Sequence, residues 1–232
     1  MDNFKLNTCE TCFVHNDLFR KITKEEIDVL SYIKNCNTYD KGDIIYNEGS
    51  RIPGVYCLNS GIVKHYKTGN DGKEQIIRFS KVGEIFGYRS ILSAEPACTT
   101  AKVVEESSVC LIPATHFINL VNKNSDFAMS VIKLSCKELG DANQYILDIA
   151  QKNVRERLAE ILLLLHENFG INEDGYLNIF LTREELAGLV GTATESVIRL
   201  LSEFKKDGLT ELNKRKIKLL DLKKLKHISQ SF

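Results

Sequence analysis

The sequence has no tryptophan, only three prolines and no excess of either charge among its 232 residues. Its longest apolar run, Ile161 to Leu165, is far shorter than the about 20 residues of a membrane-spanning helix. The first residues, MDNFKLNTCE, lack the apolar core of a secretory signal. We therefore expect a cytoplasmic protein that does not bind a membrane. The balance of 31 basic and 31 acidic residues excludes a chain that is basic throughout, but not a local basic patch.

Catalytic signatures are missing as well. The sequence contains no glycine loop of the kind that cradles phosphate and no recognisable catalytic triad. We therefore do not expect an enzyme.

Cysteine is present in an odd number, seven, all within the first 136 residues. In a reducing compartment a framework of disulfides is not expected. Cys57 and Cys136 lie in apolar patterns and are interpreted as small buried hydrophobes. Cys9 and Cys12 form a C-x-x-C pair in a polar stretch, which can direct two thiolates at one metal ion or cluster. A redox pair and a pair without special chemistry are the alternatives.

Charge is unevenly distributed along the chain. Residues 181–232 contain eleven Lys or Arg against seven Asp or Glu, so the first 180 residues carry the opposite excess. This asymmetry favours a sensor domain followed by a domain that binds a polyanion, although a solvated basic face would have the same composition.

Residues 38–113 are rich in glycine and in short runs of alternating apolar residues. Turn signals separate these runs, and Asn70-Asp71-Gly72 is typical of a hairpin. The pattern predicts a β-barrel or sandwich. A short amphipathic helix is expected before it, at residues 24–34.

A helical period follows, and residues 127–151 contain a heptad pattern. Such a seam predicts a long helix packed against the same helix of a second copy, with packing inside one domain as the alternative. We therefore expect the chain to divide into a β-rich segment at 1–125, the long helix at 126–152 and a third segment at 153–232. The third segment begins with a second helix at 154–168. The predicted dimer seam consists of Ile132, Leu139, Ala142, Ile146 and Ile149.

Residues 181–209 carry the pattern of two short helices joined at Gly191. Thr182-x-x-Glu185 and Thr192-x-x-Glu195 both match the capping box that begins a helix. An apolar seam between the helices completes a predicted helix-turn-helix, and it comprises Leu186, Val190, Val197 and Leu200.

The second of these helices would expose Thr194, Glu195, Ile198 and Arg199 near its start, where a helix in the major groove reads bases. Arginine can donate two hydrogen bonds to guanine, and glutamate can accept one from cytosine. Glu195 and Arg199 are four residues apart and can also form an ion pair. A helix cap and a surface ion pair are the alternatives for these two residues.

Two short apolar runs then flank the turn at Asn213, which predicts a β-hairpin wing. Its cations suit phosphate groups, which provide affinity without choosing a sequence. The predicted contacts with the DNA backbone are Thr182, Thr192, Lys214, Arg215 and Lys216.

Taken together, KGDIIYNEG, NSGIVKHYKTGNDGKEQIIRF, VGEIFGYRSIL, SVCLIP and the helix-turn-helix resemble the Crp/Fnr family of bacterial transcription regulators. The resemblance covers residues 9 to 228. It implies an α+β chain with a cyclic-nucleotide-binding-like β-roll (a jelly roll), a long dimerisation helix and a C-terminal winged helix-turn-helix. It also implies a homodimer on palindromic promoter DNA, with RNA polymerase as a partner. Glu195 and Arg199 stand at the family's base-reading positions, whereas Thr194 and Ile198 stand where members vary.

The cyclic-AMP branch of that family grips its ligand with a Gly-Glu pair and, further on, an Arg-Ser pair. Here these places contain Gly87-Tyr88 and Ala97-Cys98-Thr99. An anionic phosphodiester buried without a cation is costly, so cyclic AMP is not expected.

The oxygen-sensing branch holds an iron–sulfur cluster on three N-terminal cysteines and one from the roll. Cys9, Cys12 and Cys110 match three of these places, but Leu18 occupies the fourth. Cys36 or His15 would have to replace the missing ligand. An iron–sulfur cluster, a metal site, a thiol redox switch, an uncharged ligand near Tyr88 and Cys98, and no effector at all remain alternatives.

Two rival functions have weaker support. In the first, the β-roll binds an effector and the C-terminal half contacts proteins, but a basic wing and exposed Glu195 and Arg199 favour DNA. In the second, Cys9 and Cys12 serve a thiol oxidoreductase, but no βαβ pattern surrounds them.

Overall fold

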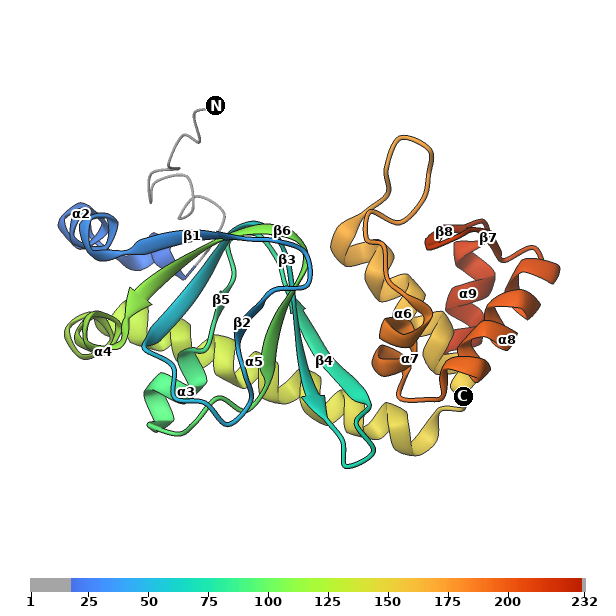
Figure 1. Ribbon diagram of the computed structural model, residues 1–232, viewed down its shortest axis with the longest axis horizontal. Helices are drawn as coiled ribbons and strands as arrows, with labels where there is room; N and C mark the ends of the chain where they lie inside the picture. Colours follow the sequence, from blue (N-terminus) through green and yellow to red (C-terminus); the bar gives the residue numbers. More distant parts are fainter. Residues whose placement is uncertain (1–17, 231–232) are drawn as a thin grey trace. The chain divides into compact units, whose positions relative to one another are not determined.

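The computed structural model describes residues 18–230, which form two compact units (Figure 1). The first contains the described residues up to Lys67 together with Ile76–Leu139. The second contains Thr68–Gln75 and the residues from Gly140 onward. In the described part of the chain, no helix combines the length and the hydrophobicity needed to cross a membrane.

The first unit is built on an antiparallel β-roll, so the predicted fold class is confirmed. Its strand order is β1-β6-β3-β4, with β2 paired to β6 and β5 paired to β3. Side chains alternate along β3: Val55 and Cys57 enter one core, and Tyr56 and Leu58 enter the other. The strands are β1 (Asn35–Tyr39), β2 (Ile44–Tyr46), β3 (Gly54–Thr68), β4 (Glu74–Ser80), β5 (Ile85–Phe86) and β6 (Thr100–Pro113).

Helices pack over the core that contains Val55 and Cys57, which we call the outer core of this unit. Thr23 caps α2 through a reciprocal capping box with Glu26, which confirms the helix predicted at this place. The ring of Phe127 lies 5.9 Å from that of Phe19 and 5.7 Å from that of Phe117. The helices are η1 (Phe19–Lys21), α2 (Lys24–Ile33), α3 (Tyr88–Ser93), α4 (Ala114–Lys123) and the first part of α5 (Ser125–Gln151).

Aromatic side chains pack together in the inner core of the roll. Tyr56 and Phe86 are stacked with their ring centroids 5.3 Å apart, and Tyr46 is 5.4 Å from Tyr56. His65 meets the ring of Phe86 edge-on and shares a 2.9 Å hydrogen bond with Ser80. Burial is the main cause that raises the pKa of Tyr46 and lowers that of His65 well below its usual value.

The hairpin predicted at Asn70-Asp71-Gly72 joins β3 and β4. Gly72 has a φ of 79°, a left-handed conformation that suits glycine, and its amide donates to the Gly69 carbonyl at 3.0 Å.

In the second unit, α6 follows α5 after a break at Lys152 and Asn153. Asn153 caps α6 through a capping box with Glu156. Leu158, Leu162 and Leu165 form the buried face of α6. The remaining elements are α6 (Val154–Phe169), α7 (Arg183–Val190), α8 (Thr194–Lys206), β7 (Thr210–Asn213), β8 (Lys216–Leu219) and α9 (Leu222–Ser229).

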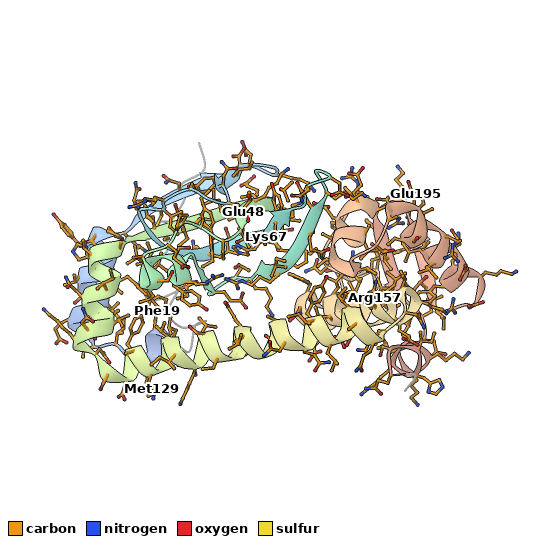
Figure 2. The ribbon with its side chains drawn as sticks, turned by 90° about the horizontal axis from the view of Figure 1, so that it is seen from below. Phe19, Glu48, Lys67, Met129, Arg157 and Glu195 are labelled. Atoms are coloured by element: carbon orange, nitrogen blue, oxygen red, sulfur yellow. A yellow bond between two sulfur atoms is a disulfide. The ribbon has the colours of Figure 1, made fainter. Side chains whose placement is uncertain are left out.

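An apolar stripe runs along α5. Its large members are between 39 % and 65 % exposed, which is high for branched aliphatic side chains, and Ala142 is exposed as well. Met129, labelled in Figure 2, is exposed one turn before Ile132. The large members are Ile132, Leu139, Ile146 and Ile149.

The roll contains a disulfide between Cys36 and Cys110, contrary to the expectation that the cysteines are not paired. The two residues face each other on β1 and β6, and their Cα atoms are 4.0 Å apart. Strand register thus brings together two cysteines that are 74 residues apart in sequence.

Candidate nucleic-acid interface

The first helix of the pair, α7, begins as predicted. The amide of Glu185 donates to the Thr182 hydroxyl at 3.1 Å, and the amide of Thr182 donates to the Glu185 carboxylate at 2.8 Å. Gly191 ends the helix with a φ of 69°, and its amide donates to the Ala187 carbonyl at 2.9 Å. Thr182 and Gly191 therefore fix the two ends of α7.

The second helix, α8, begins differently from the prediction. Its N-cap is Ala193, and no side chain caps it, so the capping box predicted for Thr192 and Glu195 is wrong. The reason lies in the preceding turn, where the amide of Thr192 donates to the Ala187 carbonyl at 3.1 Å. Thr192 thus belongs to the end of α7, and α8 starts at Thr194.

The apolar seam between α7 and α8 is confirmed. All four predicted seam residues are at most 4 % exposed, and Ala187 beside them is also buried. The seam fixes the second helix against the first, so the opposite face of α8 is turned to solvent. The four residues are Leu186, Val190, Val197 and Leu200.

The solvent face of α8 carries the four predicted base-reading residues near its start. Glu195, Ile198 and Arg199 are exposed, and Thr194 is half-buried. Figure 2 shows Glu195 at the surface of this unit. The predicted ion pair between Glu195 and Arg199 is replaced by another, because the Arg199 guanidinium lies 2.7 Å from the carboxylate of Glu203.

Glu203 links α8 to α6. Its carboxylate also accepts from the guanidinium of Arg155 at 3.2 Å, and Arg155 pairs with Asp207 at 2.8 Å. The same guanidinium lies 4.7 Å from the centre of the Phe204 ring. Sequence reasoning missed Arg155 and Glu203, since nothing in the spacing of α6 indicates a partner about 50 residues later.

The predicted wing is confirmed as the hairpin of β7 and β8, in which Asn213 pairs with Lys216. Lys214 and Arg215 form its turn and are exposed, and Lys214 has a φ of 52°. Arg183 at the start of α7 supports the turn by donating to the Lys214 carbonyl at 3.0 Å. Burial lowers the pKa of Arg183, a residue that sequence reasoning missed.

Lys216 differs from the other two cations of the wing. Its ammonium lies 5.8 Å from the ring centres of both Tyr176 and Phe180, so it lies over the aromatic pair. The outward cations of the turn are Lys214 and Arg215.

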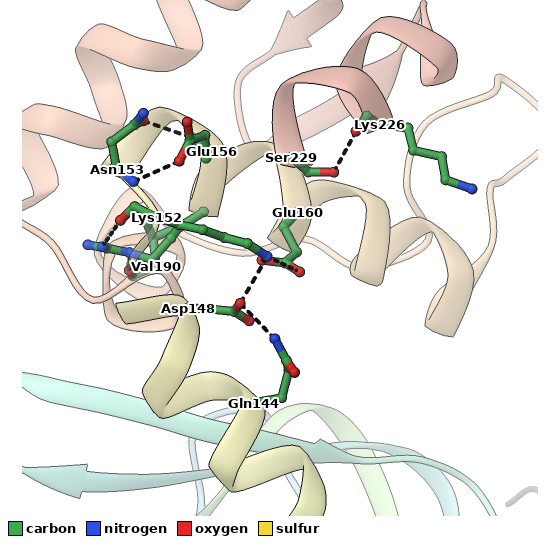
Figure 3. Close-up of polar contacts among 10 residues, drawn as sticks. Gln144, Asp148, Lys152, Asn153, Glu156, Glu160, Val190, Lys226 and Ser229 are labelled. Carbon is green, nitrogen blue, oxygen red and sulfur yellow. Dashed lines mark hydrogen bonds and ion pairs between the residues drawn. The ribbon is translucent and has the colours of Figure 1, made fainter. Parts of the chain in front are cut away.

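A polar network joins the end of α5 to α6 and to the turn after α7 (Figure 3). Arg157 donates to the carbonyls of Lys152 at 2.8 Å and Val190 at 2.9 Å, and makes longer contacts with those of Ile149 and Gly191. These carbonyls lie at the negative ends of two helix dipoles, where a guanidinium is stabilising.

Lys152 extends the same network. Its ammonium lies 2.9 Å from the carboxylate of Asp148 and 2.7 Å from that of Glu160, so it joins α5 to α6 by charge as well (Figure 3). Sequence reasoning missed this network, of which only the Asn153-x-x-Glu156 capping box could have been found from local spacing.

Of the three predicted iron–sulfur ligands, only Cys110 lies among the described residues. Cys9 and Cys12 lie outside the described part of the chain. The disulfide with Cys36 corrects the ligand role expected for Cys110, because a disulfide sulfur is not a thiolate. Among residues 18–230, no group of three or more His, Cys, Asp or Glu side chains is arranged to hold a metal ion. The described residues therefore do not fit the cluster.

Comparison with known proteins adds two family matches. Residues 36–124 match the model of the cyclic nucleotide-binding domain, and residues 156–228 match that of the Crp-like helix-turn-helix domain. The first match falls on the β-roll, and the second begins in α6 and ends in α9.

Similar proteins of known role align with most of the chain. Electron transport regulator A of Shewanella oneidensis is 28 % identical over 205 residues, which cover 86 % of this chain and 81 % of that protein. The transcriptional activator protein anr of Pseudomonas aeruginosa is 27 % identical over 204 residues, 86 % of this chain and 83 % of its own.

Solved structures share the fold. A mutant of CooA from Carboxydothermus hydrogenoformans is 27 % identical, with a TM-score of 0.72 over 88 % of this chain and 90 % of that one. FixK2 of Bradyrhizobium japonicum is 24 % identical, with a TM-score of 0.76 over 84 % of this chain and 97 % of its own.

Proposed function

Because the chain belongs to the Crp/Fnr family of transcription regulators, we propose that it binds a palindromic promoter site as a homodimer, with α8 in the major groove of each half-site. The DNA-binding helix-turn-helix and a role in transcription regulation follow from the family itself. The observation that carries the finer proposal is the exposed face at the start of α8. This face lies opposite the buried seam with α7.

Four side chains on that face are proposed to read bases. Arg199 can donate two hydrogen bonds to a guanine, and Glu195 can accept from a cytosine. Thr194 and Ile198 lie on the same exposed part of the helix and suit contacts with a thymine methyl group.

Contacts with phosphate are proposed to set the register of α8 on the duplex. Lys214 and Arg215 extend from the turn of the wing, and Thr182 and Thr192 lie at the two ends of α7. Such contacts provide affinity at any sequence. Lys216 remains a proposed contact, with its charge placed over Tyr176 and Phe180 rather than at the tip.

The dimer is proposed to form along α5. Its apolar stripe recurs at heptad spacing and is exposed in the single chain, which supports packing against a second copy. Two recognition helices would then meet half-sites about one helical turn apart, as a palindromic site requires.

The remaining assignments are proposals on the same basis. Segment 1–125 acts as the sensor, 126–152 as the dimerisation helix and 153–232 as the DNA-binding domain, with RNA polymerase as a partner. The rival function, a C-terminal half that contacts proteins, lacks a specific observation, because the exposed start of α8 and the wing turn carry charged side chains.

Binding measurements with duplexes that carry each base substitution in turn test this proposal. Arg199→Ala should lose discrimination at one base pair of each half-site, worth about 1–3 kcal/mol. Lys214→Ala is the matched control. It should weaken binding to all sequences alike, and it should reduce the slope of the logarithm of the binding constant against the logarithm of salt concentration by about one unit. If Arg199→Ala keeps every base preference of the unsubstituted protein, the base-reading role is wrong.

A further inference from the structure

Three cysteines form one row across the sheet of the first unit. Cys110 of β6 pairs in register with Cys36 of β1 on one side and with Cys57 of β3 on the other. Residues directly opposite each other on antiparallel strands place their side chains on the same face. Cys110 therefore lies between two cysteines, one bonded to it as a disulfide and one that carries a thiol.

The members of this row differ in their access to solvent. Cys57 and Cys110 are each 3 % exposed, whereas Cys36 is half-buried on β1, at one end of the strand order. Cys57 also belongs to the outer core, which contains Leu18, Phe19 and Ile22 from the start of the described chain. The row therefore runs from the half-buried Cys36 to Cys57 inside the core.

We propose that this row, Cys36–Cys110–Cys57, is a thiol–disulfide exchange site that moves its disulfide from one strand pair to the next. The Cys57 thiol gives up its proton, and its thiolate attacks Sγ of Cys110. A Cys57–Cys110 bond forms as the Cys36–Cys110 bond breaks, and the electron pair leaves on Sγ of Cys36, which takes up a proton. One thiol and one disulfide are present before and after, so the step needs no external oxidant or reductant.

The order of the strands supports this step. Exchange requires the entering and leaving sulfurs to lie on opposite sides of the sulfur under attack, and β3 and β1 flank β6 on opposite sides. Directly opposed cysteines on neighbouring strands have Cα atoms about 4.5–5.5 Å apart, a span that a disulfide can bridge.

The same geometry excludes a third pairing. Cys36 and Cys57 are two strands apart, about 9.5 Å at ordinary strand spacing, and disulfides do not bridge Cα atoms more than about 7 Å apart. Cys110 is therefore a member of every disulfide that the row can form. Exchange would also release the Cys36 thiol on β1, where it is half-buried and can attack a disulfide in solution. This function goes beyond DNA binding and does not depend on it.

Peptide mapping tests the proposal, because trypsin places the three cysteines on separate peptides, residues 35–41, 52–64 and 103–123. The probe is full-length protein in which Cys9, Cys12, Cys98 and Cys136 are replaced by Ser. It is oxidised, held in mildly alkaline buffer, quenched with acid, alkylated and digested. We expect two linked products, 35–41 with 103–123 and 52–64 with 103–123. Neither should form in Cys110→Ser protein.

Two controls make the result decisive. The same protein in denaturant should also yield the product that links 35–41 with 52–64, since no strand register then keeps Cys36 from Cys57. Mapping of the unsubstituted protein shows whether the four serines alter the row. Absence of the 52–64 with 103–123 product from both native proteins overturns the proposal. Formation of the 35–41 with 52–64 product by native protein overturns it as well.

Discussion

Arg157 offers the sharpest test of how the second unit is held together. Its guanidinium donates to the carbonyls of Lys152 and Val190 at 2.8 and 2.9 Å and lies farther from two others. Arg157→Met retains an unbranched apolar side chain where the aliphatic part of the arginine lies, and it removes all the N–H donors of the guanidinium. Hydrogen bonds to a charged group contribute about 1.5–3 kcal/mol each, and partial exposure of Arg157 reduces this value. We expect a loss of about 2–3 kcal/mol.

Calorimetry of the full chain measures this loss. For a chain of this size a change of 1 kcal/mol shifts Tm by about 2–4 °C, so the Tm of the chain should fall by roughly 5–10 °C. Arg51→Met, at an exposed position before β3, is the control and should change the free energy of unfolding by less than about 0.5 kcal/mol. If Arg157→Met is as stable as Arg51→Met, the carbonyl contacts do not stabilise the unit.

Two further predictions concern the dimer and pH. Replacing Ile146 and Ile149 together with Glu should bury like charges in the proposed interface, so light scattering should show a monomer and tight operator binding should be lost. Asn143→Glu, exposed on the same helix, should remain a dimer. Because burial lowers the pKa of His65, the unfolded chain takes up a proton near pH 6.5 that the native state does not, and stability falls below that pH by up to about 1.4 kcal/mol per unit. His65→Gln should remove this slope from denaturant titrations, and an unchanged slope would assign it to other groups.

Local signals in the sequence were enough for the helix-turn-helix. A capping threonine, a turn glycine and four apolar positions depend only on near neighbours, and the structure has Thr182, Gly191 and the buried seam as predicted. The start of α8 differs from the prediction because Thr192-x-x-Glu195 matches the capping-box motif although Thr192 belongs to the end of α7. The amide of Thr192 is used to close α7, a competition that the motif itself does not reveal.

Long-range register explains what sequence reasoning missed in the roll. The absence of disulfides was inferred from the expected compartment, which says nothing about which cysteines become neighbours. Cys36 and Cys57 each face Cys110 only because β1 and β3 both pair with β6 at those residues. Register of this kind is set by the whole sheet, since a shift of one residue would turn each side chain to the other face.

The partner of Arg199 shows how tertiary contacts decide between equal local choices. Glu195 and Glu203 both lie four residues from Arg199, and spacing alone favours the pair with the glutamate on the N-terminal side. Glu203 is the partner in the structure, where it also holds Arg155 of α6. The arginine side chain is 66 % exposed, and surface ion pairs of this kind contribute about 0–1 kcal/mol. In the proposed base-reading role, a bidentate contact with guanine provides about 1–3 kcal/mol of discrimination, so the correct base can draw Arg199 away from Glu203 whereas a poorly matched base cannot. The ion pair with Glu203 is lost when Arg199 binds a base, so its about 0–1 kcal/mol is subtracted from what the contact with guanine provides.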